Sequence, residues 1–159
     1  MNMNNKTLEK TAAPPKRGLE LLHDPLLNKG TAFTRGERLR LGLLGLLPPA
    51  VSDPQKQAER VIRNVRKRAA AIEKYVDMLS LLDRNTTLFY QVVTRNIEEL
   101  MPIIYTPTVG QGCQLYAHLF RRSRGLFITR QERGMVRDVL RNWPQRDVRV
   151  IVATDGERI

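Results

Sequence analysis

The sequence has one cysteine, Cys113, among its 159 residues, so an internal disulfide framework is excluded. A lone thiol is typical of proteins from reducing compartments. Long apolar runs are also missing, since residues 41–47 contain two glycines and are far too short to cross a bilayer. Residues 1–16 lack the apolar core of a signal peptide. These absences disfavour secretion and membrane insertion and predict a cytoplasmic protein, with the mitochondrial matrix as the alternative in a eukaryote.

Motifs that carry a complete catalytic site are missing as well. The sequence has no HExxH, no CxxC, no Walker loop and no carboxylate pair at metal-ligand spacing, so it predicts no metal site within the chain. The pair Gly110 and Gly112 does not complete a dinucleotide fingerprint, because Leu115 stands where a third glycine is needed. His23 and His118 are isolated, and isolated histidines are more often structural than catalytic.

Positive charge is what the sequence has in excess. Its 27 Lys and Arg residues outnumber 16 Asp and Glu residues, and the net charge of +11 favours anionic partners such as nucleic acid, phosphates or dicarboxylates. The densest basic cluster, residues 56–74, lacks the interleaved aromatic side chains that stack on bases. A basic helical nucleic-acid binder is therefore the weaker hypothesis, and a solvated helix face is the simpler interpretation.

Apolar spacing predicts a mostly α N-terminal domain followed by the truncated start of an α/β domain. Residues 1–16 are polar and predict a flexible tail, residues 17–123 a helical domain, and residues 124–159 a strand, helix, strand unit. Because two strands do not form a stable sheet alone, this unit is expected to continue beyond residue 159.

The individual elements follow from the same spacing and from capping signals. Thr34 is expected to cap one helix, and Asp53 or Ser52, with Pro54 at the first helical position, is expected to start another. The predicted helices are 17–28, 34–43, a single long helix 53–79, 84–100, 106–120 and 131–141. The predicted strands are 125–129 and 147–154.

The stretch of residues 101–112, MPIIYTPTVGQG, stands out from the rest. Pro102 is expected to end one helix and lead into an extended segment, after which Thr106 and Pro107 begin the next helix. Tyr105 is thus predicted just before a helix N-terminus, a position that favours a nearby anion. A packed aromatic is still the commoner role, since a phenol with an ordinary pKa of about 10 needs a nearby cation to act as an acid near neutrality.

Six blocks of the sequence resemble, in order and spacing, the N-terminal region of malic enzymes. They are RGLELLHDPLLNKG (17–30), LLGLLPP (43–49), LFY (88–90), LMPIIYTPTVG (100–110), FRRSRGLFI (120–128) and TDGERI (154–159). Malic enzymes oxidise L-malate with NAD or NADP, decarboxylate bound oxaloacetate with Mn²⁺ or Mg²⁺, and protonate enolpyruvate to pyruvate. The resemblance implies that Tyr105 is the catalytic proton donor and that Arg158 lies beside the substrate carboxylate and the nicotinamide.

The resemblance also implies what this chain does not carry. The family's base lysine, its metal-binding acids and its nucleotide-binding domain correspond to positions beyond Ile159. We therefore expect the cofactor and the metal ion to bind mainly outside this chain, and the chain alone to be inactive. The full-length protein is expected to form a homodimer or a homotetramer. A malolactic enzyme, which converts malate to lactate, shares these blocks and stays an alternative.

Two further arginines match a regulatory site found in some members of the family. Chiefly mitochondrial, NAD-dependent malic enzymes bind an activating fumarate through two arginines, and Arg60 and Arg84 fall at the matching positions. Ser52 stands where the acidic partner of that site belongs. The sequence is consistent with a dicarboxylate site at this pair. It is equally consistent with a solvated basic face that includes Arg60.

Overall fold

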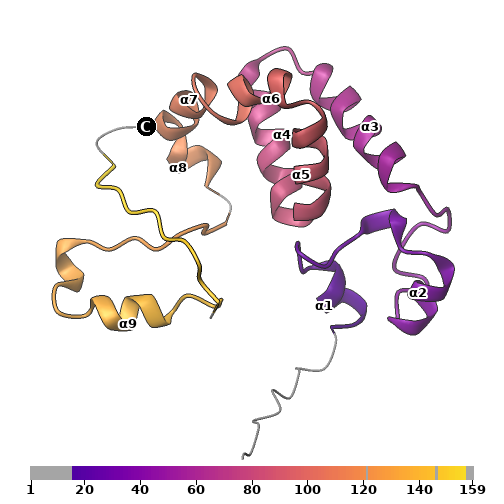
Figure 1. Ribbon diagram of the computed structural model, residues 1–159, viewed down its shortest axis with the longest axis horizontal. Coiled ribbons are helices and arrows are strands. Elements are labelled where there is room, and N and C mark those ends of the chain that lie inside the picture. Colours follow the sequence, from indigo (N-terminus) through magenta and orange to yellow (C-terminus); the bar gives the residue numbers. More distant parts are fainter. Residues whose placement is uncertain (1–15, 121, 146, 157–159) are drawn as a thin grey trace, which may run out of the picture.

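The structure is a computed structural model that describes residues 16–120, 122–145 and 147–156. Helices make up all the regular structure in these ranges (Figure 1). Their bounds are α1 (Gly18–Leu22), η1 (Gly30–Ala32), α2 (Arg35–Arg40), α3 (Pro54–Arg66), α4 (Ala71–Arg84), α5 (Thr86–Arg95), α6 (Ile97–Ile104), α7 (Thr108–Gln114), α8 (Tyr116–Leu119), η2 (Arg130–Glu132) and α9 (Val136–Arg141). Among the described residues, none of these helices combines the length and the apolar character needed to cross a membrane.

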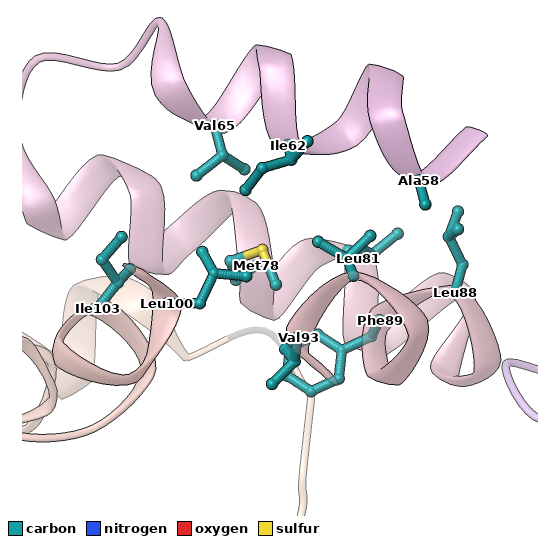
Figure 2. Packing of buried hydrophobic residues seen from close by; sticks show 11 residues of the cluster. Ala58, Ile62, Val65, Met78, Leu81, Leu88, Phe89, Val93, Leu100 and Ile103 are labelled. Carbon is teal, nitrogen blue, oxygen red and sulfur yellow. The ribbon is translucent and has the colours of Figure 1, made fainter. Parts of the chain in front are cut away.

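The main core lies between helices α3, α4, α5 and α6. Figure 2 shows how side chains from α3 face those of the other three helices. Met78, Val92 and Leu100, one from each of α4, α5 and α6, have no exposed surface. The buried members of this core are Ala58, Ile62, Val65, Met78, Leu81, Leu88, Phe89, Val92, Val93, Leu100 and Ile103. The predicted apolar stripes thus form one shared core.

The prediction of one long helix over residues 53–79 is wrong, because the chain turns back between α3 and α4. The start of α3 is as predicted, with Asp53 as N-cap and Pro54 in the first turn. The helix ends at Arg66, and α4 begins at Ala71. A straight helix would hold Ala58 and Leu81 about 35 Å apart at a rise of about 1.5 Å per residue. The turn brings both side chains into the same core.

The prediction that Pro102 ends a helix is also wrong. The helix predicted over 84–100 is divided, because α5 covers Thr86–Arg95 and α6 begins at Ile97 and continues through Pro102 to Ile104. A proline inside a helix loses one backbone hydrogen bond. Leu100 and Ile103, on either side of the proline, are buried in the main core, and this packing offsets the loss.

The predicted strands 125–129 and 147–154 are not strands within the described part of the chain. A strand needs a hydrogen-bonded neighbour, and neither segment has a ladder partner here. Their apolar side chains stay exposed, with Val150 and Val152 at 80% and 88%. Of the helix predicted over 131–141, the structure has the short turn η2 and the helix α9. The mostly helical fold is therefore confirmed, whereas the strands are not.

A second, smaller core joins α1, α2 and the loop that follows them. Leu21, Phe33 and Leu43 are buried there. Beside them lies a buried arginine, Arg38, which is only 4% exposed. Its guanidinium donates hydrogen bonds to five backbone carbonyls, those of Thr31, Phe33, Pro48, Pro49 and Ala50, at 2.7 to 3.3 Å.

Arg38 therefore connects the segments before and after α2. A planar guanidinium with five N–H donors can reach several carbonyls in one plane, which an ammonium cannot do. The proline-rich loop 48–50 has few N–H groups of its own, and its three carbonyls accept hydrogen bonds from the Arg38 guanidinium. Arg38 belongs to none of the sequence motifs described above.

We predict that replacing Arg38 with lysine destabilises the protein. The change leaves some of the five buried or part-buried carbonyl bonds unmade, and the free energy of unfolding should fall by about 2 kcal/mol. Urea unfolding followed by circular dichroism measures this. The matched control is Arg35→Lys, at an exposed position of the same helix, which should change little. Equal midpoints for the two variants would contradict the role given to Arg38.

The N-terminus of α2 carries a capping box, as the sequence predicts for Thr34. The Thr34 N–H donates to the Glu37 carboxylate at 2.9 Å, and Lys29 forms an ion pair with the same carboxylate at 2.6 Å. The hydrogen bond from Lys29, and then the one from the Thr34 N–H, lower the pKa of Glu37 from 4.5 to about 2. Helix α2 ends at Arg40, a few residues before the predicted end.

This lowered pKa predicts a stability contribution that depends on pH. The contribution is complete above pH 4.5, the ordinary pKa of the carboxyl, and it is lost as the pH falls towards about 2. Glu37→Gln keeps an acceptor but loses the charge. At pH 7 it should lower the free energy of unfolding by about 0.3–1 kcal/mol, and the melting temperature should fall with it. The difference should shrink steadily between pH 5 and pH 2 in calorimetry. A difference independent of pH would contradict this interpretation.

Candidate active site

Tyr105 lies in the short connection between α6 and α7. Its backbone is extended, with φ −129° and ψ −152°. Its N–H donates to the Met101 carbonyl at 2.8 Å, and its carbonyl accepts the N–H of Val109 at 2.9 Å. The backbone is thus held from both helices, while the residue is 58% exposed. The structure places Tyr105 shortly before a helix, as predicted.

A third hydrogen bond joins α6 and α7 across this connection. The hydroxyl of Thr108, a residue only 3% exposed, donates to the Pro102 carbonyl at 2.7 Å. The predicted cap at Thr106 is wrong, because α7 starts at Thr108 with Pro107 as its N-cap and no side-chain cap. The hydroxyl that fixes this turn therefore belongs to Thr108, two residues later.

Helix α7 is in turn held against α4 through Gly112. A Cβ added to Gly112 would lie 2.7 Å from the Cε1 atom of Tyr75, which is closer than real Cβ contacts. Only glycine lets the two helices approach to this distance. Burial of the Tyr75 ring, and then the charge of nearby Cys113, raise the pKa of the Tyr75 phenol. Cys113 itself is exposed.

Beside this contact, α4, Gly112 of α7 and the chain after α7 line a partly open cavity of about 250 Å³. Tyr75, Tyr116 and Phe127 line it with aromatic surface. Arg124 closes one side through bonds to the Leu79 carbonyl at 3.0 Å and to Asp83 at 2.8 Å. Tyr105 is not among its lining residues, so the cavity and the candidate proton donor are separate features.

The other residues predicted for the site are Arg158, Arg84 and Arg60. Arg158 lies outside the described residues, so its place beside the substrate carboxylate and the nicotinamide stays a prediction. Arg84, at the end of α4, lines an open hollow of about 390 Å³ between α3 and α4. Arg60 is exposed on α3 and is not among the lining residues. An ion pair between Arg68 and Asp77, 2.6 Å apart, forms part of the hollow's wall.

Metal ions are not accommodated by the described part of the chain. Within residues 16–120, 122–145 and 147–156, no three His, Cys, Asp or Glu side chains group in a way that could hold one. Tyr105, the residue predicted to be the proton donor, is described by the structure, and its backbone is held by hydrogen bonds on both sides.

Sequence reasoning missed three residues of this site: Tyr75, Thr108 and Gly112. A signal for Gly112 was present, because a glycine inside an amphipathic helix often marks close packing. The spacing of Gly110 and Gly112 was considered only as a nucleotide-binding pattern. No comparable signal marks Thr108, since its bond depends on the helical path through Pro102.

The sequence of this chain is similar to proteins of one family. Residues 82–159 match the family model described as malic enzyme, N-terminal domain. NADP-dependent malic enzyme 1 from Arabidopsis thaliana is 50% identical over 142 residues, which are 89% of this chain and 24% of that protein. NADP-dependent malic enzyme from Anas platyrhynchos is 49% identical over 144 residues, 91% of this chain and 26% of that protein.

A third relative is the NADP-dependent malic enzyme, chloroplastic, of Oryza sativa subsp. japonica, 48% identical over 142 residues, 89% of this chain and 22% of that protein. This chain thus spans about a quarter of the length of the curated relatives it matches. All three relatives are named malic enzymes. The malolactic and nucleic-acid-binding alternatives gain no support from them.

We predict that Gly112→Ala loosens α7 from α4. The added methyl group collides with the Tyr75 ring, and overpacking of this kind costs about 1–3 kcal/mol. The measurement is the urea unfolding midpoint. Gly36→Ala is the matched control, because Gly36 is also helical but has nothing within 4 Å of an added Cβ. This control should stabilise slightly, since alanine is the better helix former. Equal effects at both positions would refute the contact.

Proposed function

This chain belongs to the malic enzyme family, whose N-terminal domain it carries, and we propose that its whole protein converts L-malate to pyruvate and CO₂ while reducing NADP. The observation that carries the proposal is the identity of about half of all residues over most of the chain. NADP is preferred over NAD in this proposal, because the relatives compared above are named NADP-dependent.

Tyr105 is the catalytic proton donor in this proposal. After decarboxylation the substrate is enolpyruvate, and the phenol O–H gives its proton to C3, which becomes the methyl group of pyruvate. Fixed backbone bonds on both sides of Tyr105 and its exposed side chain support this role. A general acid must be held within reach of the atom it protonates, and a fixed backbone favours this.

Arg158 is the substrate-binding residue in this proposal. A guanidinium can grip a carboxylate with two parallel hydrogen bonds, which suits a dicarboxylate such as malate. The divalent metal ion, Mn²⁺ or Mg²⁺, activates the carbonyl for decarboxylation when it is bound. Since the described residues contain no group of three metal-binding side chains, we assign no step of that chemistry to this chain.

The proposal also covers the domain organisation, the oligomeric state and the cellular location of the protein. Residues 17–123 form the helical domain and residues 124–159 begin an α/β domain, in which 125–129 and 147–154 become strands once neighbouring strands pair with them. The exposed valines and isoleucine of residues 148–152 support this, because such surface is normally covered. We also propose a homodimer or homotetramer. The cytoplasmic location is supported by the single cysteine.

Regulation by a dicarboxylate at Arg60 and Arg84 is the least supported part of the proposal. The open hollow between α3 and α4, which Arg84 lines, supports such a site. Ser52 in place of an acidic partner, and the position of Arg60 outside that lining, speak against it.

We predict that Tyr105→Phe in the whole protein lowers kcat for pyruvate formation by about 10²–10⁴-fold, the usual contribution of a general acid. The change keeps the ring and removes only the donor. NADPH absorbance at 340 nm measures turnover. Incorporation of deuterium into the methyl group of added pyruvate in D₂O, followed by NMR, reports deprotonation and reprotonation at C3 without hydride transfer or decarboxylation, and it should be lost as well.

Tyr90→Phe serves as the matched control, because Tyr90 is 57% exposed and Tyr105 is 58% exposed. It should keep both activities. If Tyr105→Phe retained the deuterium incorporation of the unaltered protein, Tyr105 would not be the proton donor. If the unaltered whole protein formed no pyruvate from malate and NADP, the proposed function itself would be wrong.

A further inference from the structure

We propose that Thr108 is a positioning residue for Tyr105, acting through the hydrogen bond from its hydroxyl to the Pro102 carbonyl. The inference rests on the proposed function, because it concerns how the candidate proton donor is held. The O···O distance of 2.7 Å is that of a good hydroxyl-to-carbonyl bond.

The bond spans the segment that carries Tyr105. Pro102 lies in the last turn of α6 and Thr108 is the first residue of α7, so the bond closes a loop of seven residues. Within that loop, the Tyr105 N–H is bonded back to Met101 and its carbonyl is bonded forward to Val109. The Thr108 bond is the one that links the two ends of the loop to each other.

Burial makes this bond hard to replace. Thr108 is 3% exposed, so water cannot readily substitute for its hydroxyl, whereas Tyr105 is 58% exposed. The last carbonyls of a helix have no partner inside the helix, and Pro102 carries one of them in α6. Thr108 satisfies that carbonyl and at the same time fixes the direction in which α7 leaves α6.

The packing around the loop explains why one bond matters here. Ile103 is anchored in the main core, and Gly112 holds α7 against Tyr75 of α4. The α6 end of the loop is therefore fixed in the main core, and the α7 end is fixed against α4. Only the residues between these two ends can shift. A displacement of about 1 Å at a reacting group can reduce turnover by about 10²-fold.

The test is Thr108→Val in the whole protein, which replaces the hydroxyl with a methyl group of similar size. We expect kcat and the deuterium incorporation into pyruvate to fall by about 10–100-fold, with the KM for malate little changed. Thr108→Ser, which restores a hydroxyl, should recover most of the loss. Thr86→Val is the matched control, since it removes a part-buried hydrogen bond from the Thr86 hydroxyl of α5 to the Leu82 carbonyl of α4, and kcat should stay within about twofold of the original.

A double-mutant cycle separates positioning from general loss of structure. In the Tyr105→Phe protein, adding Thr108→Val should cause no further fall in kcat, because the group it positions is already gone. An equal fall in both backgrounds, or no recovery with serine, would overturn the inference. If Tyr105→Phe abolished protonation while Thr108→Val left it intact, the inference would fail and the proposed function would stand.

Discussion

The close approach of α7 to α4 at Gly112 is the contact on which the geometry around Tyr105 depends. Tyr75 occupies the space that a side chain at this position would need. Because α7 lies against α4 here, its first residue is brought under the end of α6, where the Thr108 hydroxyl reaches the Pro102 carbonyl. Tyr105, between the two helices, is then fixed by its own backbone bonds.

The described part of the chain is divided into a packed region up to Gly112 and an exposed region after it. The described residues from 16 to 112 contain two cores and a buried arginine that joins loop to helix. After Gly112, no described residue is buried. The candidate proton donor lies at the edge of the packed part, where a rigid support meets open surface. That is where a group must lie if it is to act on a substrate held partly by other residues.

Much of the helical fold could be predicted from the sequence, because local signals dominate it. Thr34 and Asp53 cap helices as their residue types predict, and the apolar stripe of α3 is buried as its spacing predicts. The turn between α3 and α4 could not be predicted, since the apolar spacing continues across it. Pro102 was misjudged because its neighbours Leu100 and Ile103 outweigh the lost bond. The predicted strands depend on partners that the described residues do not provide.

The candidate site was predictable in its motif and not in its support. Tyr105 follows from the YTPTVG block, whereas the roles of Thr108 and Gly112 follow only from the path of the chain. The most direct measurement is a crystal structure of the whole protein with bound L-malate. Our account predicts the Tyr105 hydroxyl about 3–3.5 Å from C3 of malate, with the Thr108 to Pro102 bond intact. A Tyr105 side chain turned away from the bound dicarboxylate, with another acid facing C3, would contradict it.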